Sequence, residues 1–205
     1  MKKMKTTILL LLISLFTFKT QAQESYKGNI LISAYCGLPN TLRLNLAATE
    51  DIPNDARYSG LSPFGIRGVI KVNDKVSIGF DVIYGFAKAK YSITDSIFTN
   101  GQWASETNDY SISKQRLRPQ FRINRHFTTG SNLDHYVGFA VGGNSRWTKE
   151  YVNKVLITEN TKESTIGLSM RLCYGFSYSL THNIGLGGEI GLGGPLLQMA
   201  VTYKL

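Results

Sequence analysis

The feature that most constrains the fold is a two-residue alternation across residues 164–180, STIGLSMRLCYGFSYSL. One set of alternate positions is large and apolar, and it consists of Ile166, Leu168, Met170, Leu172, Tyr174, Phe176, Tyr178 and Leu180. The residues between them are small or polar. Successive side chains of a β-strand point to opposite faces, so this period indicates a strand. A soluble sheet seldom keeps one face apolar for so long, and we therefore expect this face to contact lipid.

The same alternation recurs along the chain and predicts eight strands. They cover approximately residues 27–36, 62–72, 75–91, 108–126, 134–148, 164–180, 183–193 and 196–205. The connections alternate between tight turns and long polar loops, the loops being 37–61, 92–107 and 149–163. Apolar outward faces, small or polar inward faces and this alternation predict an all-β fold, an eight-stranded antiparallel up-and-down transmembrane β-barrel.

The alternative with eight strands is a soluble, lipocalin-like barrel with the reverse polarity, apolar inside and polar outside. In that barrel Tyr174, Phe176 and Tyr178 would all lie in the lumen. Eight strands enclose a lumen just wide enough for ordinary side chains, so this row is too bulky for it. The transmembrane barrel is therefore the favoured interpretation.

The N-terminal residues 1–22 have the pattern of a secretory signal peptide. Basic residues precede an apolar run of about eleven residues, which is too short for a membrane-spanning helix. Thr20 and Ala22 fit the rule of small residues at a cleavage site, so Gln23 is the expected mature start. The alternative is an N-terminal core helix. We expect a signal peptide at 1–22, a barrel domain at 23–205 and a location in the bacterial outer membrane.

The net charge, the cysteine positions and the motifs argue against nucleic-acid binding, a disulfide bond and a metal or cofactor site. The chain has 23 Lys and Arg against 14 Asp and Glu. Without Lys2, Lys3, Lys5 and Lys19 of the signal peptide, 19 cations face 14 anions, a bias too mild to indicate nucleic-acid binding. Cys36 and Cys173 fall on strands far apart around the barrel, so we expect no disulfide between them. No metal-ligand spacing or phosphate-binding loop is present, and we expect no metal and no cofactor.

The C-terminal segment LLQMAVTYKL places Leu197, Met199, Val201, Tyr203 and Leu205 on one face. It resembles the terminal strand that the barrel assembly machinery of Gram-negative bacteria recognises, although that strand usually ends in Phe. With the signal peptide and the eight strands, the whole mature chain resembles the small OmpA/OmpX-type outer-membrane β-barrels. The resemblance implies outer-membrane lipid, lipopolysaccharide and the assembly machinery as partners.

The predicted lumen combines many cations with two carboxylates. The inward cations are Arg67, Lys71, Arg116, Arg118, Arg122, Arg171 and Lys204, and the inward acids are Asp81 and Glu189. The turn at 73–74 sets the register of its hairpin and places Asp81 directly opposite Arg67. Glu189 falls opposite Gly175, which leaves room for Arg171 or Arg122 to reach it. We expect a lumen ion-pair network, water-filled pockets and no continuous pore.

The predicted outer rim carries cations on its lipid-side face. Lys88 and Lys90 continue the outward face of strand 75–91, and Lys149 lies just beyond Trp147. At that height they either contact lipopolysaccharide phosphates or form an ordinary solvated rim. The strand at 76–91 spans ~40 Å of height when it is tilted, against an apolar band of about 25 Å. We expect the third to sixth strands to protrude on the outer side.

The candidate functions are a structural or surface-interaction role and lipid-directed catalysis. A lipid A deacylase or acyltransferase needs a nucleophile and a base at the outer leaflet. His126, His135 and His182 all map to the short turns at the opposite end, which disfavours this enzyme, and loop acids such as Asp95 are its remaining candidates. A lumen filled with side chains disfavours a general porin. We expect a barrel that meets lipopolysaccharide or a surface partner through its outer loops.

Overall fold

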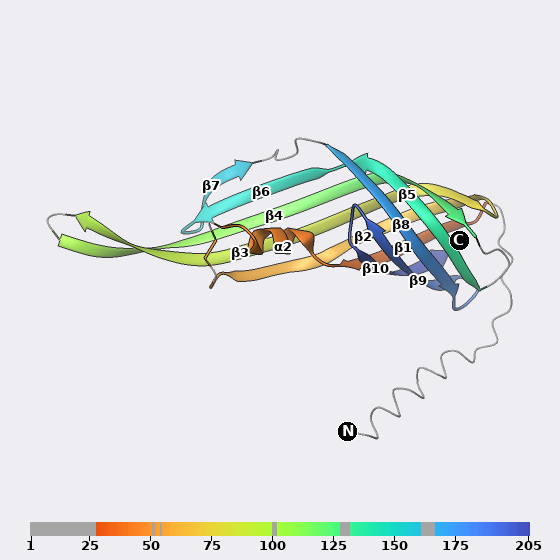
Figure 1. The fold of residues 1–205 in the computed structure, drawn as a ribbon, viewed down its shortest axis with the longest axis horizontal. Helices are drawn as coiled ribbons and strands as arrows, with labels where there is room; N and C mark the ends of the chain where they lie inside the picture. The colour runs from red at the N-terminus through yellow and green to blue at the C-terminus, as the bar shows by residue number, and fades with distance from the viewer. Residues whose placement is uncertain (1–27, 51, 54, 100–101, 128–131, 161–166) are drawn as a thin grey trace, which may run out of the picture.

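A computed structural model of the chain describes residues 28–50, 52–53, 55–99, 102–127, 132–160 and 167–205. This part contains ten strands and one helix (Figure 1). Their bounds are β1 Ile30–Leu38, α2 Thr41–Ala47, β2 Arg57–Asn73, β3 Val76–Thr99, β4 Gln102–His126, β5 Leu133–Gly143, β6 Ser145–Val152, β7 Val155–Asn160, β8 Leu168–Ser179, β9 Ile184–Leu192 and β10 Leu197–Lys204. The predicted signal peptide lies outside the described residues.

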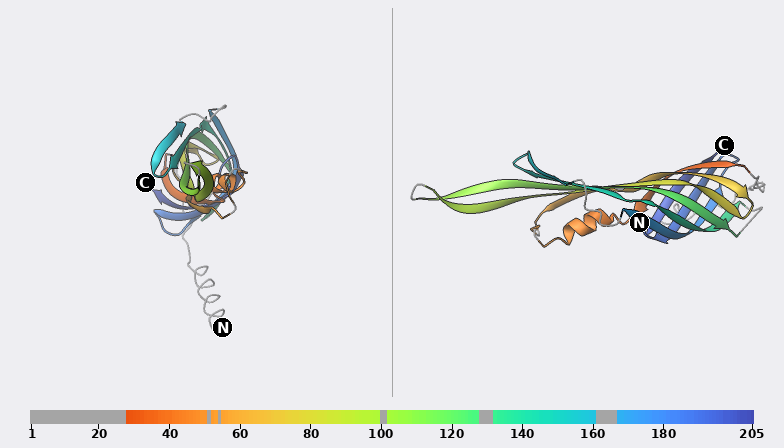
Figure 2. Two further views of the ribbon diagram at one scale, coloured as in Figure 1. Left: turned by 90° about the vertical axis from the view of Figure 1, so that its left-hand side faces the viewer. Right: turned by 90° about the horizontal axis from the view of Figure 1, so that it is seen from above.

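Eight of the strands form a closed antiparallel ring. Hydrogen bonding runs in the order β3, β2, β1, β10, β9, β8, β5 and β4, and β4 returns to β3. The end-on view shows the closed ring, and the view from above shows the barrel at one end of an elongated molecule (Figure 2). The eight-stranded up-and-down barrel predicted from the alternation is confirmed.

The polarity of the wall is that of a transmembrane barrel. On β8, Leu168, Met170 and Leu172 are exposed, whereas Ser169 and Arg171 between them are buried. The most deeply buried side chains of the described chain include arginines and an aspartate, so the lumen is polar. This excludes the soluble barrel with an apolar interior. No helix among the described residues is long and apolar enough to cross a membrane.

The predicted loop at 92–107 is wrong, because most of it extends the β3–β4 hairpin. These strands have 24 and 25 residues, and a strand of that length spans roughly 80 Å. The register stays continuous from Val76 opposite Arg125 to Thr99 opposite Gln102. Polar cross-strand pairs hold the outer part, as in the contact of 2.9 Å between the hydroxyls of Thr94 and Thr107. The hairpin projects far beyond the barrel (Figures 1 and 2).

The single strand predicted at 134–148 is divided, and the loop predicted at 149–163 contains a hairpin. The division lies at Asn144, after which β6 continues beside the outer part of β4. The chain then turns back at Asn153 and Lys154, whose φ angles are 50° and 68°. Two consecutive residues with positive φ suit a tight turn that matches the strand twist. The turn brings β7 back along β6.

The predicted loop at 37–61 contains α2 and the beginning of β2. Asn40 caps the helix, since its side chain accepts hydrogen bonds from the backbone N–H groups of Leu42 and Arg43. Leu42 and Leu46, one turn apart, pack with Ala87 and Ala89 on the inner face of β3. The helix thus covers the inner side of the protruding sheet with a small apolar core.

The expectation that the third to sixth strands protrude holds for three of them. β3, β4 and β6 extend beyond the barrel, and so does the first part of β2. The sixth strand does not extend within the described residues, since β8 begins at Leu168 opposite Gly143. Ile166, which the alternation placed on the lipid face, lies outside the described residues. The C-terminal strand β10 ends beside Asn183, at the end of the short turns.

Candidate functional site

An ion-pair network fills the barrel interior. Arg67 on β2 lies opposite Asp81 on β3, and its Nη2 is 3.2 Å from Asp81 Oδ2. The same guanidinium reaches across the lumen to β9, where its Nη1 is 2.6 Å from Glu189 Oε1. All three side chains are buried. The structure thus brings the predicted pair together and adds a second carboxylate to the same arginine.

Two further arginines complete the network. Arg122 contacts Asp81 Oδ2 at 3.2 Å and also donates to Glu189 Oε1. Arg171 donates to Glu189 Oε2 at 3.5 Å and to the backbone oxygen of Pro195 at 2.8 Å. The sequence left the donor to Glu189 open between these two arginines, and the structure uses both. Because the carboxylates of Asp81 and Glu189 are buried and charged, the contacts to them are stronger than a neutral hydrogen bond in water.

Two tyrosines of the network were not predicted from the sequence. Tyr35 donates its hydroxyl to Asp81 Oδ1, and Tyr136 donates to Glu189 Oε1 at 2.7 Å. Both occupy inward slots of β1 and β5, so their positions in the alternation could have identified them. The two carboxylates therefore have their acceptor sites occupied. Within the described residues, the network therefore consists of carboxylates that are all engaged by arginine or tyrosine donors.

A serine, a histidine and an aspartate form a second chain at the short-turn end of the lumen. Ser77 Oγ lies 2.9 Å from His126 Nε2, and His126 Nδ1 lies 2.7 Å from Asp134 Oδ2. This is the order of groups in Ser–His–Asp hydrolases. The Ser77 side chain, however, is 0% exposed and already accepts a hydrogen bond from Asn124. The chain therefore connects buried polar groups, without access for a substrate in this conformation.

The other two histidines also lie at the short-turn end. His135 is on β5 and its ring Nδ1 lies 2.9 Å from the Tyr174 hydroxyl, on the exposed face of the wall. His182 is in the connection between β8 and β9. None of the three histidines is near the protruding end, where a lipid A-modifying centre would have to be. No group of three His, Cys, Asp or Glu side chains in the described part of the chain could hold a metal ion.

The lipid-side face of the protruding sheet carries a cationic surface, which we call the outer groove. Its volume is about 980 Å³. The cations that line it are Arg57, Lys88, Lys90, Lys149 and Lys154. Two carboxylates, those of Asp55 and Asp109, also line it. The three lysines singled out in the sequence thus belong to one surface, where five cations face two anions and leave a net excess of three positive charges.

The outer groove begins where the apolar band ends. Along the outward face of β3, Val82, Tyr84 and Phe86 are followed directly by Lys88 and Lys90. Arg57 joins this surface because β2 pairs with β3 and places it opposite Lys90. The sequence could not include Arg57, since it was assigned to a loop.

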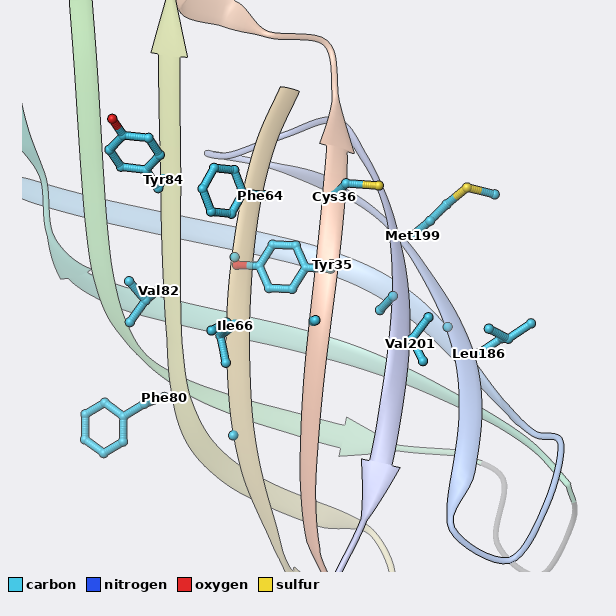
Figure 3. A pocket seen from close by; sticks show the side chains of 15 residues that line it. Tyr35, Cys36, Phe64, Ile66, Phe80, Val82, Tyr84, Leu186, Met199 and Val201 are labelled. Atoms are coloured by element: carbon cyan, nitrogen blue, oxygen red, sulfur yellow. The ribbon is translucent and has the colours of Figure 1, made fainter. Parts of the chain in front are cut away.

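An apolar groove of about 1110 Å³ lies on the lipid-facing wall below the outer groove (Figure 3). Its floor includes Ala34 and Cys36, the two smallest outward side chains of β1. Bulky side chains rise on both sides of this strand, namely Phe64, Ile66, Phe80, Val82 and Tyr84 on β2 and β3 and Leu186, Met199 and Val201 on β9 and β10. The groove is therefore a consequence of two small residues between large ones.

The two cysteines are both free. Cys36 is exposed on the outer wall and Cys173 is buried in the lumen. They lie on opposite faces of different strands, so the absence of a bond between them agrees with the sequence analysis. Cys36 is consequently a single accessible thiol within the apolar groove.

Comparisons with known proteins give likeness only at the level of structure. No family model matches the sequence, and no curated protein matches it. The chain is similar to the N-terminal β-barrel domain of Pseudomonas aeruginosa OprF, with 15% identity, a TM-score of 0.44 and coverage of 87% of this chain and 98% of the other. It is also similar to Ail, the attachment invasion locus protein of Yersinia pestis, with 12% identity, a TM-score of 0.36 and coverage of 88% and 100%. The architecture itself follows from the closed ring of eight strands in this chain.

Proposed function

We propose that this protein is an integral β-barrel of the bacterial outer membrane that binds lipopolysaccharide phosphates through its outer groove. The observation that carries the proposal is the position of Lys88, Lys90 and Lys149 on the lipid-side face, directly above the apolar band. The outer leaflet carries phosphates at this height. Lysines there gain ~1 kcal/mol each from an anionic surface, and they can pair directly with phosphate oxygens.

The apolar groove supports the same ligand. Val82 and Tyr84 of β3 line the apolar groove, and the next outward residues, Phe86 and Lys88, line the outer groove. A lipid with a phosphorylated headgroup and acyl chains is likewise charged on the water side and apolar on the bilayer side, in the same order as the two grooves. We infer that one acyl chain of the bound lipid occupies the apolar groove while its phosphate contacts the lysines.

The filled lumen favours a structural or surface-interaction role over a general porin. Arg67, Arg122 and Glu189 connect opposite walls of the barrel, and eight strands leave little space around them. An outer-membrane lipid A deacylase or acyltransferase is the alternative. It is disfavoured because Ser77 and His126, the described Ser–His pair, face the lumen at the opposite end.

We propose that β10 is the segment recognised by the barrel assembly machinery. Its outward residues Leu197, Met199, Val201 and Tyr203 are all exposed and apolar or aromatic. They form a continuous apolar face up to the C-terminus, as the sequence analysis expected for a terminal recognition strand.

The lipopolysaccharide proposal is tested with a triple variant in which Lys88, Lys90 and Lys149 are replaced by Gln. Binding of fluorescent lipopolysaccharide is measured in phosphatidylcholine nanodiscs at fixed ionic strength. At about 1 kcal/mol per lysine, the affinity should fall about 100-fold. The matched control is Lys75→Gln, an exposed lysine in a short turn, which should bind as wild type. Equal affinity of the triple variant and the control would contradict the proposal, as would equal binding of dephosphorylated lipopolysaccharide.

The protruding sheet supports a second role, the docking of a surface partner by strand addition. Among the described strands, β7 pairs only with β6, and so it has a free edge. Val155, Leu156 and Ile157 on it are 65%, 44% and 63% exposed, and an exposed apolar edge strand can accept an added strand. Hydrogen exchange of the Val155–Ile157 amides tests this role. Slower exchange on intact cells than in the purified protein supports it, and equal exchange excludes it.

A further inference from the structure

Three arginines gather on the inner face of the wall, at the outer end of the lumen. Arg116 on β4 lies directly opposite Arg146 on β6, and Arg118 is the next residue on the same face of β4. Like charges directly opposite each other in an antiparallel pair are destabilising. This cluster, which we call the arginine cluster, therefore requires a compensating anion or strong hydration.

No described carboxylate supplies that compensation. On the neighbouring β3, the residues opposite Arg116 and Arg118 are Gly85 and Ile83. On the inner face of β6 the next carboxylate is that of Glu150, four residues beyond Arg146. Four residues of strand correspond to ~13 Å, and Glu150 is exposed there.

The two acids of the ion-pair network are committed elsewhere, and Asp134 lies at the short-turn end, beside His126 and Lys71. Asp81 contacts Arg67 and Arg122, and Glu189 contacts Arg67, Arg122 and Arg171. That network already has three cations for two carboxylates. It cannot neutralise the arginine cluster as well.

One N–H donor of each arginine in the cluster is also unsatisfied. The Nε atoms of Arg116, Arg118 and Arg146 are each buried without a hydrogen-bond partner among the described residues. Arg118 Nη1 donates to the backbone oxygen of Gly193 at 2.8 Å, which is a neutral acceptor. A guanidinium has five N–H donors in a planar fork, and buried donors without acceptors cost stability.

We propose that the arginine cluster is a binding site for a tetrahedral oxyanion, specifically a phosphate group. A phosphate presents several oxygens to which more than one guanidinium can donate two parallel hydrogen bonds. All three arginines are only partly buried, so an anion can reach them from the outer solution. The site is distinct from the outer groove, because the two lie on opposite faces of β4.

The test is NMR observation of the arginine Nε–Hε resonances in detergent micelles without lipopolysaccharide, titrated with inorganic phosphate. The three resonances should shift and reach saturation before the added phosphate raises the ionic strength to the physiological value of ~0.15 M. Sodium chloride at the same ionic strength should not produce this shift. Arg116→Gln and Arg146→Gln should each weaken phosphate binding about tenfold or more, because each removes charged hydrogen bonds. Arg43→Gln on the exposed face of α2 is the matched control and should leave binding unchanged.

A shift that chloride matches at equal ionic strength would overturn the proposal, and so would unchanged binding in both lumen variants. Heat-modifiable gel mobility identifies the variants that still fold. If Arg116→Gln does not fold, Arg116→Lys replaces it in the test, because it keeps the positive charge but removes the planar fork of donors. A second titration with a hexose phosphate distinguishes the sources. Tighter binding than inorganic phosphate assigns the site to a phosphorylated glycan, and equal or weaker binding assigns it to the free ion. Since no lipopolysaccharide is present, the outcome is independent of the outer groove.

Discussion

Arg67 and Asp81 face each other on neighbouring strands, and the Arg67 guanidinium also holds Glu189 from the far side of the lumen. The contact to Asp81 is local to one hairpin, whereas the contact to Glu189 joins residues 122 positions apart in the chain. The Arg67 side chain thus connects the β2–β3 hairpin with β9 on the other side of the barrel. Its loss should weaken both the pairing within the hairpin and the contact across the lumen.

Replacement of Arg67 by Leu should lower the free energy of unfolding by about 3–5 kcal/mol, because it leaves buried carboxylates short of a cation. The measurement is urea-induced unfolding of the protein in lipid vesicles. Addition of Asp81→Leu to this variant should recover part of the loss, since one uncompensated charge disappears. Arg43→Leu on the surface of α2 is the control. A loss no larger than that of the control would show that the network contributes nothing to stability.

Replacement of Leu172 by Arg should lower the free energy of unfolding in lipid vesicles by about 2–4 kcal/mol relative to the wild type. This is the range for a cation placed at the bilayer midplane. Leu172 is 54% exposed on the membrane-facing side of β8. Leu180→Arg, at the short-turn end, is the control and should cost ~0–1 kcal/mol, as for positions near the interface. Equal stability of both variants in lipid refolding would contradict the assignment of this face to lipid.

The local part of this architecture was predictable from the sequence. The tight turn after β2 and the alternation on both sides of it predicted the register of the Arg67–Asp81 pair. The turn itself was predicted one residue too early, because it lies at Asp74 and Lys75, and an irregularity between Lys71 and Asn73 keeps the predicted pairing. The outward lysines at 88 and 90 followed from the same parity. In each case the physical cause is the alternation of side chains along a strand, which a few neighbouring residues reveal.

The non-local part was not predictable. The contact of Arg67 with Glu189 depends on how eight strands curve into a ring, which no single hairpin specifies. The long β3–β4 extension was missed because its few apolar residues, such as Ile97, Phe98 and Trp103, stand among polar ones without a regular two-residue period, so hydrophobicity gives little signal there. α2 has only seven residues, although Asn40 followed by leucines at 42 and 46 is a capping and packing signal that could have been found.

The orientation of the barrel predicts which sites are labelled on intact cells. In a background with both native cysteines replaced by Ser, Ser96→Cys in the protruding hairpin should react with an impermeant maleimide. Asp74→Cys in a short turn should react only after the cells are permeabilised. The reverse pattern would mean that the short turns face outward and that the orientation is inverted.

The Ser77–His126–Asp134 chain should be unreactive toward a fluorophosphonate probe, because the Ser77 side chain is 0% exposed. Incubation of the refolded protein with a fluorescent probe, followed by gel electrophoresis, measures this directly. A heat-unfolded sample controls for adventitious labelling. Labelling of the folded protein that disappears in Ser77→Ala would show a reactive serine and would favour the enzyme over the structural role.

The two grooves on the outer wall should act together if they hold one lipid. Cys36 is the accessible thiol in the apolar groove, so a fluorophore can be attached there without a new substitution. Lipopolysaccharide with a nitroxide on an acyl chain should quench this fluorophore more strongly than one at Leu192→Cys in a Cys36→Ser background. Leu192 is 69% exposed on the wall and does not line the groove.

Replacement of Lys88, Lys90 and Lys149 by Gln should remove this excess quenching at Cys36 and leave the quenching at position 192 unchanged. The physical reason is that the lysines hold the phosphate and thereby keep the attached chain over Ala34 and Cys36. Equal quenching at the two positions in the wild-type protein would show that the groove takes bulk lipid without preference. Excess quenching that persists in the triple variant would show that the groove binds the chain without help from the lysines.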